Sequence, residues 1–301
     1  MFNPIVCSQL PEGFEYLVDE KIPVSSLTYT IVGMIIILAV AIALTVMVVK
    51  KHKLVGLCTF AGVSIFMLFN YFFVMILTML IPAANKIAFI IIASLLSTLV
   101  PFMGRLIVIK AFSRQQNTFS SHVSYGVGIM NMKALVSLLT FVFPITNYYQ
   151  LSKYGVEHFF PAGEDAEIAL QRAENFADIF SYNYSQYMLV AIMVLGVMVY
   201  SLFASVSLYA AYNNKAGKGW YGFAFGMGFL VSLSECLYNN GILGVLPVIL
   251  MIVAAVVTAV FSIRLYNSLE IEDEEEVKEK DEDISKYAKV KIPKFKDLDK
   301  L

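Results

Sequence analysis

Residues 27–49 read LTYTIVGMIIILAVAIALTVMVV, and residues 50–53 directly after them read KKHK. The first stretch carries no charge. It is longer than the stretch of about 20 apolar residues that a helix needs to cross the hydrocarbon of a bilayer. We therefore predict a transmembrane helix here, with the basic residues at the membrane surface.

The composition of the whole chain extends this prediction. Of its 301 residues, 58% are hydrophobic and 15% are charged, whereas soluble domains contain about 25% charged residues. We expect a multi-pass protein of the cell membrane whose main partner is the lipid bilayer. The net charge of −1 gives no reason to expect nucleic acid as a partner.

Six further stretches are long and apolar enough to cross the membrane. Their apolar runs are continuous and do not alternate with polar residues, so they predict helices and not the strands of a β-barrel. The expected fold class is an all-α integral membrane protein with seven transmembrane helices, at residues 27–49, 54–81, 87–109, 123–145, 187–212, 220–238 and 242–266.

Basic residues in the connections predict the orientation, because Lys and Arg near the ends of short loops stay cytoplasmic. With the N-terminus outside, the chain divides into an extracytoplasmic segment (1–26), a membrane domain (27–266) and a charged cytoplasmic tail (267–301). The cytoplasmic side then receives Lys50, Lys51, Lys53, Lys110, Arg114, Lys215, Lys218 and Arg264.

The longest outer connection, residues 146–186, contains an amphipathic pattern over residues 164–180. This pattern predicts a helix that lies on the membrane surface or caps the bundle. A loop helix that only packs is the alternative. The acidic first half of the tail is expected to be solvated. The lysine-rich second half is expected to be solvated too, with contact to anionic lipid as the alternative.

Three ionisable residues fall inside predicted spans, where each costs about 2.5–3.5 kcal/mol on insertion scales. Arg105 lies near the cytoplasmic end of the third span, so we expect its side chain to extend to the head groups. Lys133 and Glu235 lie deeper, at similar depths in the fourth and sixth spans. An ion pair between them would offset the cost of burying either charge alone.

The expected pair has two interpretations. In one, it is structural and fixes the register of two helices. In the other, it belongs to a polar cavity that handles a ligand, a proton or a peptide. Polar residues expected to support the pair are Asn70, Asn131, Ser232 and Asn239.

Neither a metal site nor a cofactor is expected from the sequence. The histidines lack the i, i+4 spacing of a helical zinc site, the cysteines are far apart, and no phosphate-binding loop is present. The residues concerned are His52, His122, His158, Cys7, Cys58 and Cys236.

Several motifs resemble the YhfC-type family of intramembrane proteases, seven-helix bacterial proteins related in outline to the PrsW and CAAX-processing glutamic proteases. The opening VSSLT (24–28), KKHK (50–53), LVG (54–56) and FMLF (66–69) resemble the start of the family. PFMGR (101–105) is similar to its third-helix acidic–x–Gly–Arg site, and GVGIMNMKA (126–134) to its fourth-helix Gly–x–Gly–His–Gly–Gly–x–Glu–Ala string. The resemblance implies a shared scaffold at Gly104, Arg105, Gly126 and Gly128.

The catalytic groups of that family are replaced in this chain. Pro101 and Phe102 precede Gly104 where the family has carboxylates, while Ile129 and Lys133 stand for its fourth-helix histidine and glutamate. Alkyl side chains neither activate water nor stabilise an oxyanion. The resemblance therefore implies the scaffold without its proteolytic centre.

Three hypotheses for the function follow. The first is a protease-like membrane protein without proteolytic activity that binds a membrane partner. The second is an active intramembrane protease with a rearranged site that uses Glu235. The third is a small-molecule or lipid transport or binding component with a polar pocket, formed by Asn70, Asn131, Lys133 and Glu235.

Overall fold

The computed structural model describes residues 10–18, 24–80, 85–112, 118–160, 165–181 and 185–269. Within these ranges the chain forms helices and turns without any strand, which agrees with the predicted all-α class. Nearly all of the predicted tail, together with Cys7 and Arg114, lies outside the described residues.

Seven spans in the described ranges are long and apolar enough to cross a membrane, as predicted. The second span is composite, because a π-helix interrupts the α-helix. In chain order the spans are α1 (Val24–Lys51), α2 (Gly56–Ile65) with η2 (Phe66–Phe73) and α3 (Val74–Met79), α4 (Lys86–Phe112), α5 (Phe119–Tyr154), α7 (Ser185–Tyr212), α8 (Gly219–Asn239) and α9 (Leu246–Ser268).

Two spans differ most from the predicted bounds. Helix α5 has 36 residues, or about 54 Å at 1.5 Å per residue, so it extends well beyond the about 30 Å of hydrocarbon. Thr118 caps its first turn by accepting a hydrogen bond from the backbone N–H of Ser121. Helix α9 begins later than expected, because Gly241, Leu243 and Gly244 adopt positive φ, which an α-helix cannot contain.

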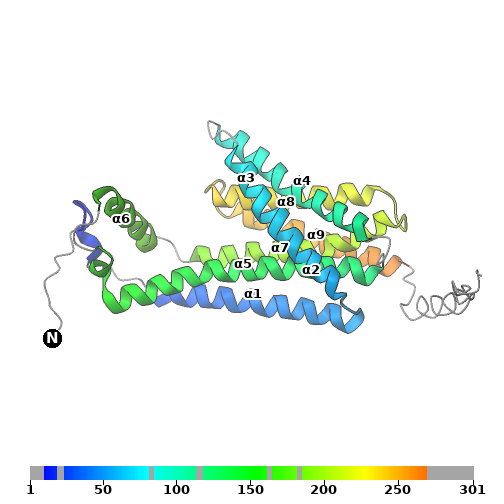
Figure 1. Ribbon diagram of the computed structural model, residues 1–301, viewed down its shortest axis with the longest axis horizontal. Coiled ribbons are helices and arrows are strands. Elements are labelled where there is room, and N and C mark those ends of the chain that lie inside the picture. Colours follow the sequence, from blue (N-terminus) through cyan, green and yellow to red (C-terminus); the bar gives the residue numbers. More distant parts are fainter. Residues whose placement is uncertain are drawn as a thin grey trace, which may run out of the picture.

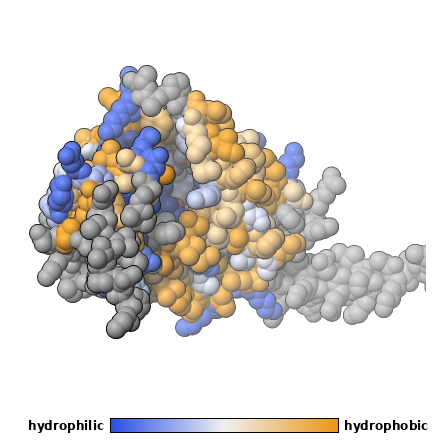
Figure 2. All heavy atoms as spheres, turned by 60° about the vertical axis from the view of Figure 1, so that its left-hand side comes forward, coloured by the Kyte–Doolittle hydropathy of each residue, from blue (hydrophilic) through white to orange (hydrophobic). Residues whose placement is uncertain are grey.

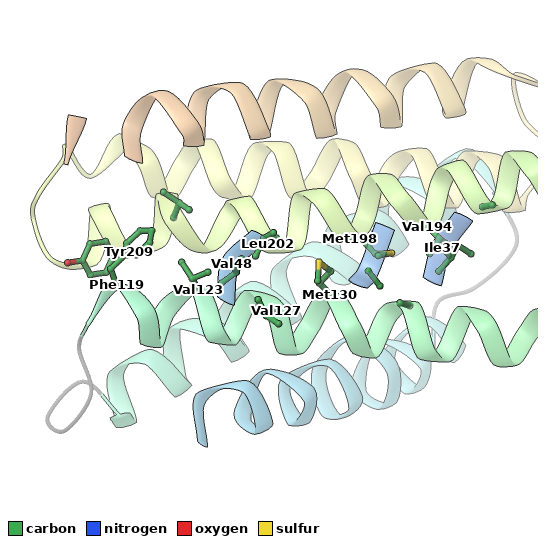
Figure 3. Close-up of a cluster of buried hydrophobic side chains, with 14 of the residues drawn as sticks. Ile37, Val48, Phe119, Val123, Val127, Met130, Val194, Met198, Leu202 and Tyr209 are labelled. Carbon is green, nitrogen blue, oxygen red and sulfur yellow. The ribbon is translucent and has the colours of Figure 1, made fainter. Parts of the chain in front are cut away.

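Helix α7 lies at the centre of the bundle and packs on α1, α5, α8 and α9. In Figure 1, α1, α5 and α7 run along the long axis, while α2, η2 and α3 cross them obliquely beside α4. The largest buried cluster joins α1, α5 and α7, and Figure 3 shows Ile37, Val127, Met130 and Met198 pointing into the space between these helices. Apolar packing thus holds the three helices together.

The outer surface of the bundle is also apolar. Large side chains such as Ile35, Ile42, Ile91 and Ile249 are at least two-fifths exposed on the spans, and hydrophobic residues cover much of the face in Figure 2. A monomeric soluble protein rarely exposes so large an apolar surface. The exposed faces match a multi-pass protein surrounded by lipid.

A small cap stands at the end of the molecule where residue 24 begins α1. It combines η1 (Glu15–Val18), the last turns of α5, η3 (Val156–Phe159) and α6 (Ala166–Ser181) (Figure 1). The apolar face of α6 packs onto Leu17 and Phe160, while Arg172 donates a hydrogen bond to the backbone oxygen of Phe159. The predicted helix at 164–180 is present and caps the bundle end, since its apolar face is turned toward protein.

Candidate functional site

Lys133 on α5 and Glu235 on α8 form an ion pair, with Lys133 Nζ 2.8 Å from Glu235 Oε1. Helices α5 and α8 do not pack closely on each other. Each of them packs on α7 instead. The side chains retain exposures of 20% and 32%. The long side chains therefore bridge a space between helices and do not lie in a closed apolar interface.

That space is a cavity of about 230 Å³ between the second span, α4, α5, α7 and α8. Both members of the ion pair line it. So do ten further residues that carry the chemistry or the shape of its wall: Asn70, Tyr71, Ser97, Thr98, Arg105, Tyr200, Ser201, Gly228, Ser232 and Phe66. The bundle thus contains a cavity in which charged and hydroxyl side chains lie among apolar ones.

Arg105 lines the same cavity, and the expectation that it reaches the head groups is wrong. Its side chain is only 6% exposed. Its Nη1 donates to the backbone oxygen of Ser201 at 3.4 Å, and its guanidinium lies 5.8 Å from the centre of the Tyr200 ring. The physical reason is that helical side chains lean toward the N-terminus of their helix. On α4 this direction leads away from the end that carries Lys110.

Tyr200 is held against the cavity by α8. Its hydroxyl donates to the backbone oxygen of Ala224 at 2.9 Å. A Cβ at Gly228 would lie 2.4 Å from that hydroxyl oxygen, so only glycine leaves room for the ring. Tyr200 and Gly228 were not among the residues expected at the site, although a tyrosine in one apolar span and a glycine in a facing span are a signal in the sequence that points to them.

Asn70 enters the cavity from the π-helix η2. Its Oδ1 atom is buried and accepts no hydrogen bond from the described part of the chain. A π-turn adds a residue to the helical repeat and frequently marks a functional position. Gly104 on α4 leaves room for the ring of Phe69, which belongs to the same π-helix, because a Cβ at this position would lie 2.6 Å from that ring.

Two of the expected supporting residues lie elsewhere. Asn131 exchanges hydrogen bonds of 3.2 and 3.3 Å with Thr45 on α1. Residues two apart on a helix do not share a face, so Asn131 cannot point with Lys133 into one cavity. Asn239 is exposed at the C-terminal end of α8. Ser232, in contrast, lines the cavity as expected.

The other glycines of the resemblance lie at helix crossings. A Cβ at Gly128 would approach the backbone oxygen of Thr59 to 2.1 Å, and one at Gly62 would approach that of Tyr125 to 2.3 Å. A Cβ at Gly126 would lie 2.5 Å from the Oγ of Ser205 on α7. These positions let α5 approach α2 and α7 closely.

The histidines and cysteines whose side chains the structure describes do not line the cavity. His52 Nε2 lies 3.1 Å from the hydroxyl of Tyr266, and His122 is buried in the first turn of α5. The side chain of His158 lies outside the described residues. Among those that are described, no three His, Cys, Asp or Glu side chains come together as a metal site would require.

No protein-family model, curated protein or solved structure matches this chain.

Proposed function

We propose that this membrane protein binds a small polar ligand in the cavity between the second span, α4, α5, α7 and α8. The observation that carries the proposal is that buried Arg105 and half-buried Lys133 and Glu235 line one cavity of about 230 Å³. Ionisable residues at membrane depth are expensive and commonly mark ligand or ion pathways. This favours the third hypothesis, with Arg105 in place of Asn131.

A purely structural ion pair explains less of this arrangement. Register between two helices requires only Lys133 and Glu235, and it is served best by tight packing around them. Here the pair lies beside open space, and the buried Oδ1 of Asn70 has no protein donor in the described ranges. A ligand in the cavity would fill the space beside the pair and donate a hydrogen bond to the Oδ1 of Asn70.

The same cavity supports the proposal that the protein does not hydrolyse peptide bonds. Its carboxylate, Glu235, is engaged by Lys133 at 2.8 Å. A general base must be free to accept a proton from water. At the scaffold residues Gly104, Gly126 and Gly128 a Cβ would collide with the neighbouring helix. The need for glycine at these positions supports our proposal of a YhfC-type layout. Binding of a membrane partner remains a prediction.

A peptide assay tests the absence of proteolysis. The purified protein is reconstituted with a panel of single-span peptides, and Glu235→Gln serves as the control. We expect both proteins to leave the peptides intact. Cleavage by the wild type that disappears in Glu235→Gln would show that the second hypothesis is right.

Binding is tested with probes that share an eight-carbon chain and differ in the head group: octanoate, octyl phosphate, octanol and octylammonium. A ligand that binds only the folded state raises the melting temperature in a concentration-dependent manner. We expect at least one probe to do so for the wild type in nanodiscs, and not for Ser232→Leu, which fills the cavity.

Ser64→Leu is the matched control, because it makes the same change on α2 outside the cavity lining. It should bind like the wild type. If no probe stabilises the wild type, or if Ser232→Leu responds as the wild type does, the cavity is not a ligand site.

A further inference from the structure

We infer that the group recognised in the cavity is an anion, a carboxylate or a phosphate, and that Arg105 is its main partner. The inference rests on the proposed function, because it names the class of ligand that the cavity binds. It follows from the charges, the unused hydrogen-bond donors and the size of the cavity.

The charges that line the cavity are unequal. Lys133 and Glu235 neutralise each other as an ion pair. Arg105 has no carboxylate oxygen within 4.0 Å among the residues that the structure describes. One positive charge is therefore in excess. A buried charge without a counter-charge is costly, and a bound anion would offset that cost.

The donors of Arg105 are mostly unused. A guanidinium carries five N–H donors, and within the described ranges one of them reaches a protein acceptor, the backbone oxygen of Ser201 at 3.4 Å. The Tyr200 ring offers a cation–π contact but leaves the N–H groups available. The planar fork of N–H groups matches the two oxygens of a carboxylate or a phosphate.

Lys133 strengthens the same preference from another wall. Its ammonium group has three donors, and one of them is directed to Glu235. The cavity thus presents cationic donors from α4 and α5 against a single carboxylate from α8. An ammonium ligand would meet the opposite arrangement, with Glu235 already paired and Arg105 repelling it.

The volume limits the part of a ligand that is enclosed. Drug-sized ligands occupy pockets of about 300–1,000 Å³, whereas this cavity measures about 230 Å³. It accommodates a small free anion or the head group of an acidic lipid. Both sources present the same chemistry to Arg105.

The dissociation constants of the eight-carbon probes test the inference on the wild-type protein in nanodiscs of neutral lipid. Charge-assisted hydrogen bonds imply that octanoate and octyl phosphate bind about 10- to 100-fold more tightly than octanol or octylammonium. Arg105→Gln should lose this preference. Arg264→Gln, on the exposed face of α9, removes an arginine outside the cavity and should keep it.

The outcomes separate the two proposals. Binding of octanol or octylammonium as tightly as octanoate, or an unchanged preference in Arg105→Gln, would overturn the anionic class while the pocket stands. Absence of binding by any probe would overturn both. If Arg105→Gln does not fold, the wild-type series still decides, and Arg105→Lys should retain the preference.

Inorganic phosphate and acetate identify the source of the anion. If they bind as tightly as the alkyl anions, the ligand is a free anion. If only the alkyl anions bind, the head group of an acidic lipid is the ligand. Either result supports recognition of an anion by Arg105.

Discussion

Removing one charge of the Lys133–Glu235 pair leaves the other without a partner at membrane depth. Breaking a fully buried pair costs about 3–5 kcal/mol. These side chains retain exposures of 20% and 32%, which reduces the penalty. The stability of the protein therefore depends on the pair as a unit more than on either residue.

We predict that Lys133→Met and Glu235→Gln each lower the free energy of unfolding by about 1–3 kcal/mol, below the range of a fully buried pair. The double variant should recover much of that loss, because it strands no charge. A double-mutant cycle of unfolding in detergent measures the coupling. Strictly additive losses would rule out an energetic contribution from the pair.

At the scale of the helices, glycine decides how closely two spans approach. Gly62 on α2 and Gly128 on α5 face each other. A Cβ on Gly62 would lie 3.1 Å from the Cα of Gly128, and a Cβ on Gly128 would lie 3.0 Å from the Cα of Gly62. Backbone atoms cannot yield as the end of a side chain does. A side chain at either position must separate the two helices.

We predict that Gly128→Ala destabilises the protein strongly, by about 1–3 kcal/mol or more as in overpacked cores. Gly222→Ala is the matched control on α8. Gly222 and Gly226 have the GxxxG spacing of closely packed helices, but a Cβ at either meets nothing within 4 Å.

Gly222→Ala should be neutral or stabilising by about 0.5–1 kcal/mol, because alanine favours the helix. The melting temperatures of the two variants, measured in the same detergent, provide the comparison. Equal melting temperatures for both would contradict the close crossing of α2 and α5.

For the whole molecule, the structure determines which connections share an end of the bundle. The C-terminal ends of α1, α7 and α9 lie together, opposite the cap (Figure 1). Lys51 and Arg264 belong to the last turns of α1 and α9, and Lys215 comes shortly after α7. Lys and Arg near span ends stay cytoplasmic. We therefore propose that the cap faces the outside of the cell and that the opposite end of the bundle faces the cytoplasm.

Cysteine labelling of intact cells checks the orientation in a background without Cys7, Cys58 and Cys236. A cysteine replacing the exposed Tyr154 should react with a membrane-impermeant reagent, and one replacing Gly217 should react only after the membrane is opened. Tyr154 is preferred to Gly155, whose φ of 74° disfavours a side chain. The reverse labelling pattern would invert the orientation.

The all-α class and the seven spans follow from the sequence alone, because crossing a bilayer depends on the local length and polarity of the chain. The sequence also indicated the Lys133–Glu235 pair, since two opposite charges at similar depth in an apolar medium have few other partners. The helix in the outer connection followed from local periodicity as well.

Only the tertiary structure decided what surrounds that pair. The sequence places Arg105 near a membrane surface, but the lean of its side chain and the packing of α4 against α8 direct it inward, where it reaches Ser201 on α7. The π-helix that carries Asn70, and the fit of Tyr200 against Gly228, depend on contacts between spans far apart in the chain. A cavity is a property of how five helix faces meet, and hydropathy along one chain does not contain that information.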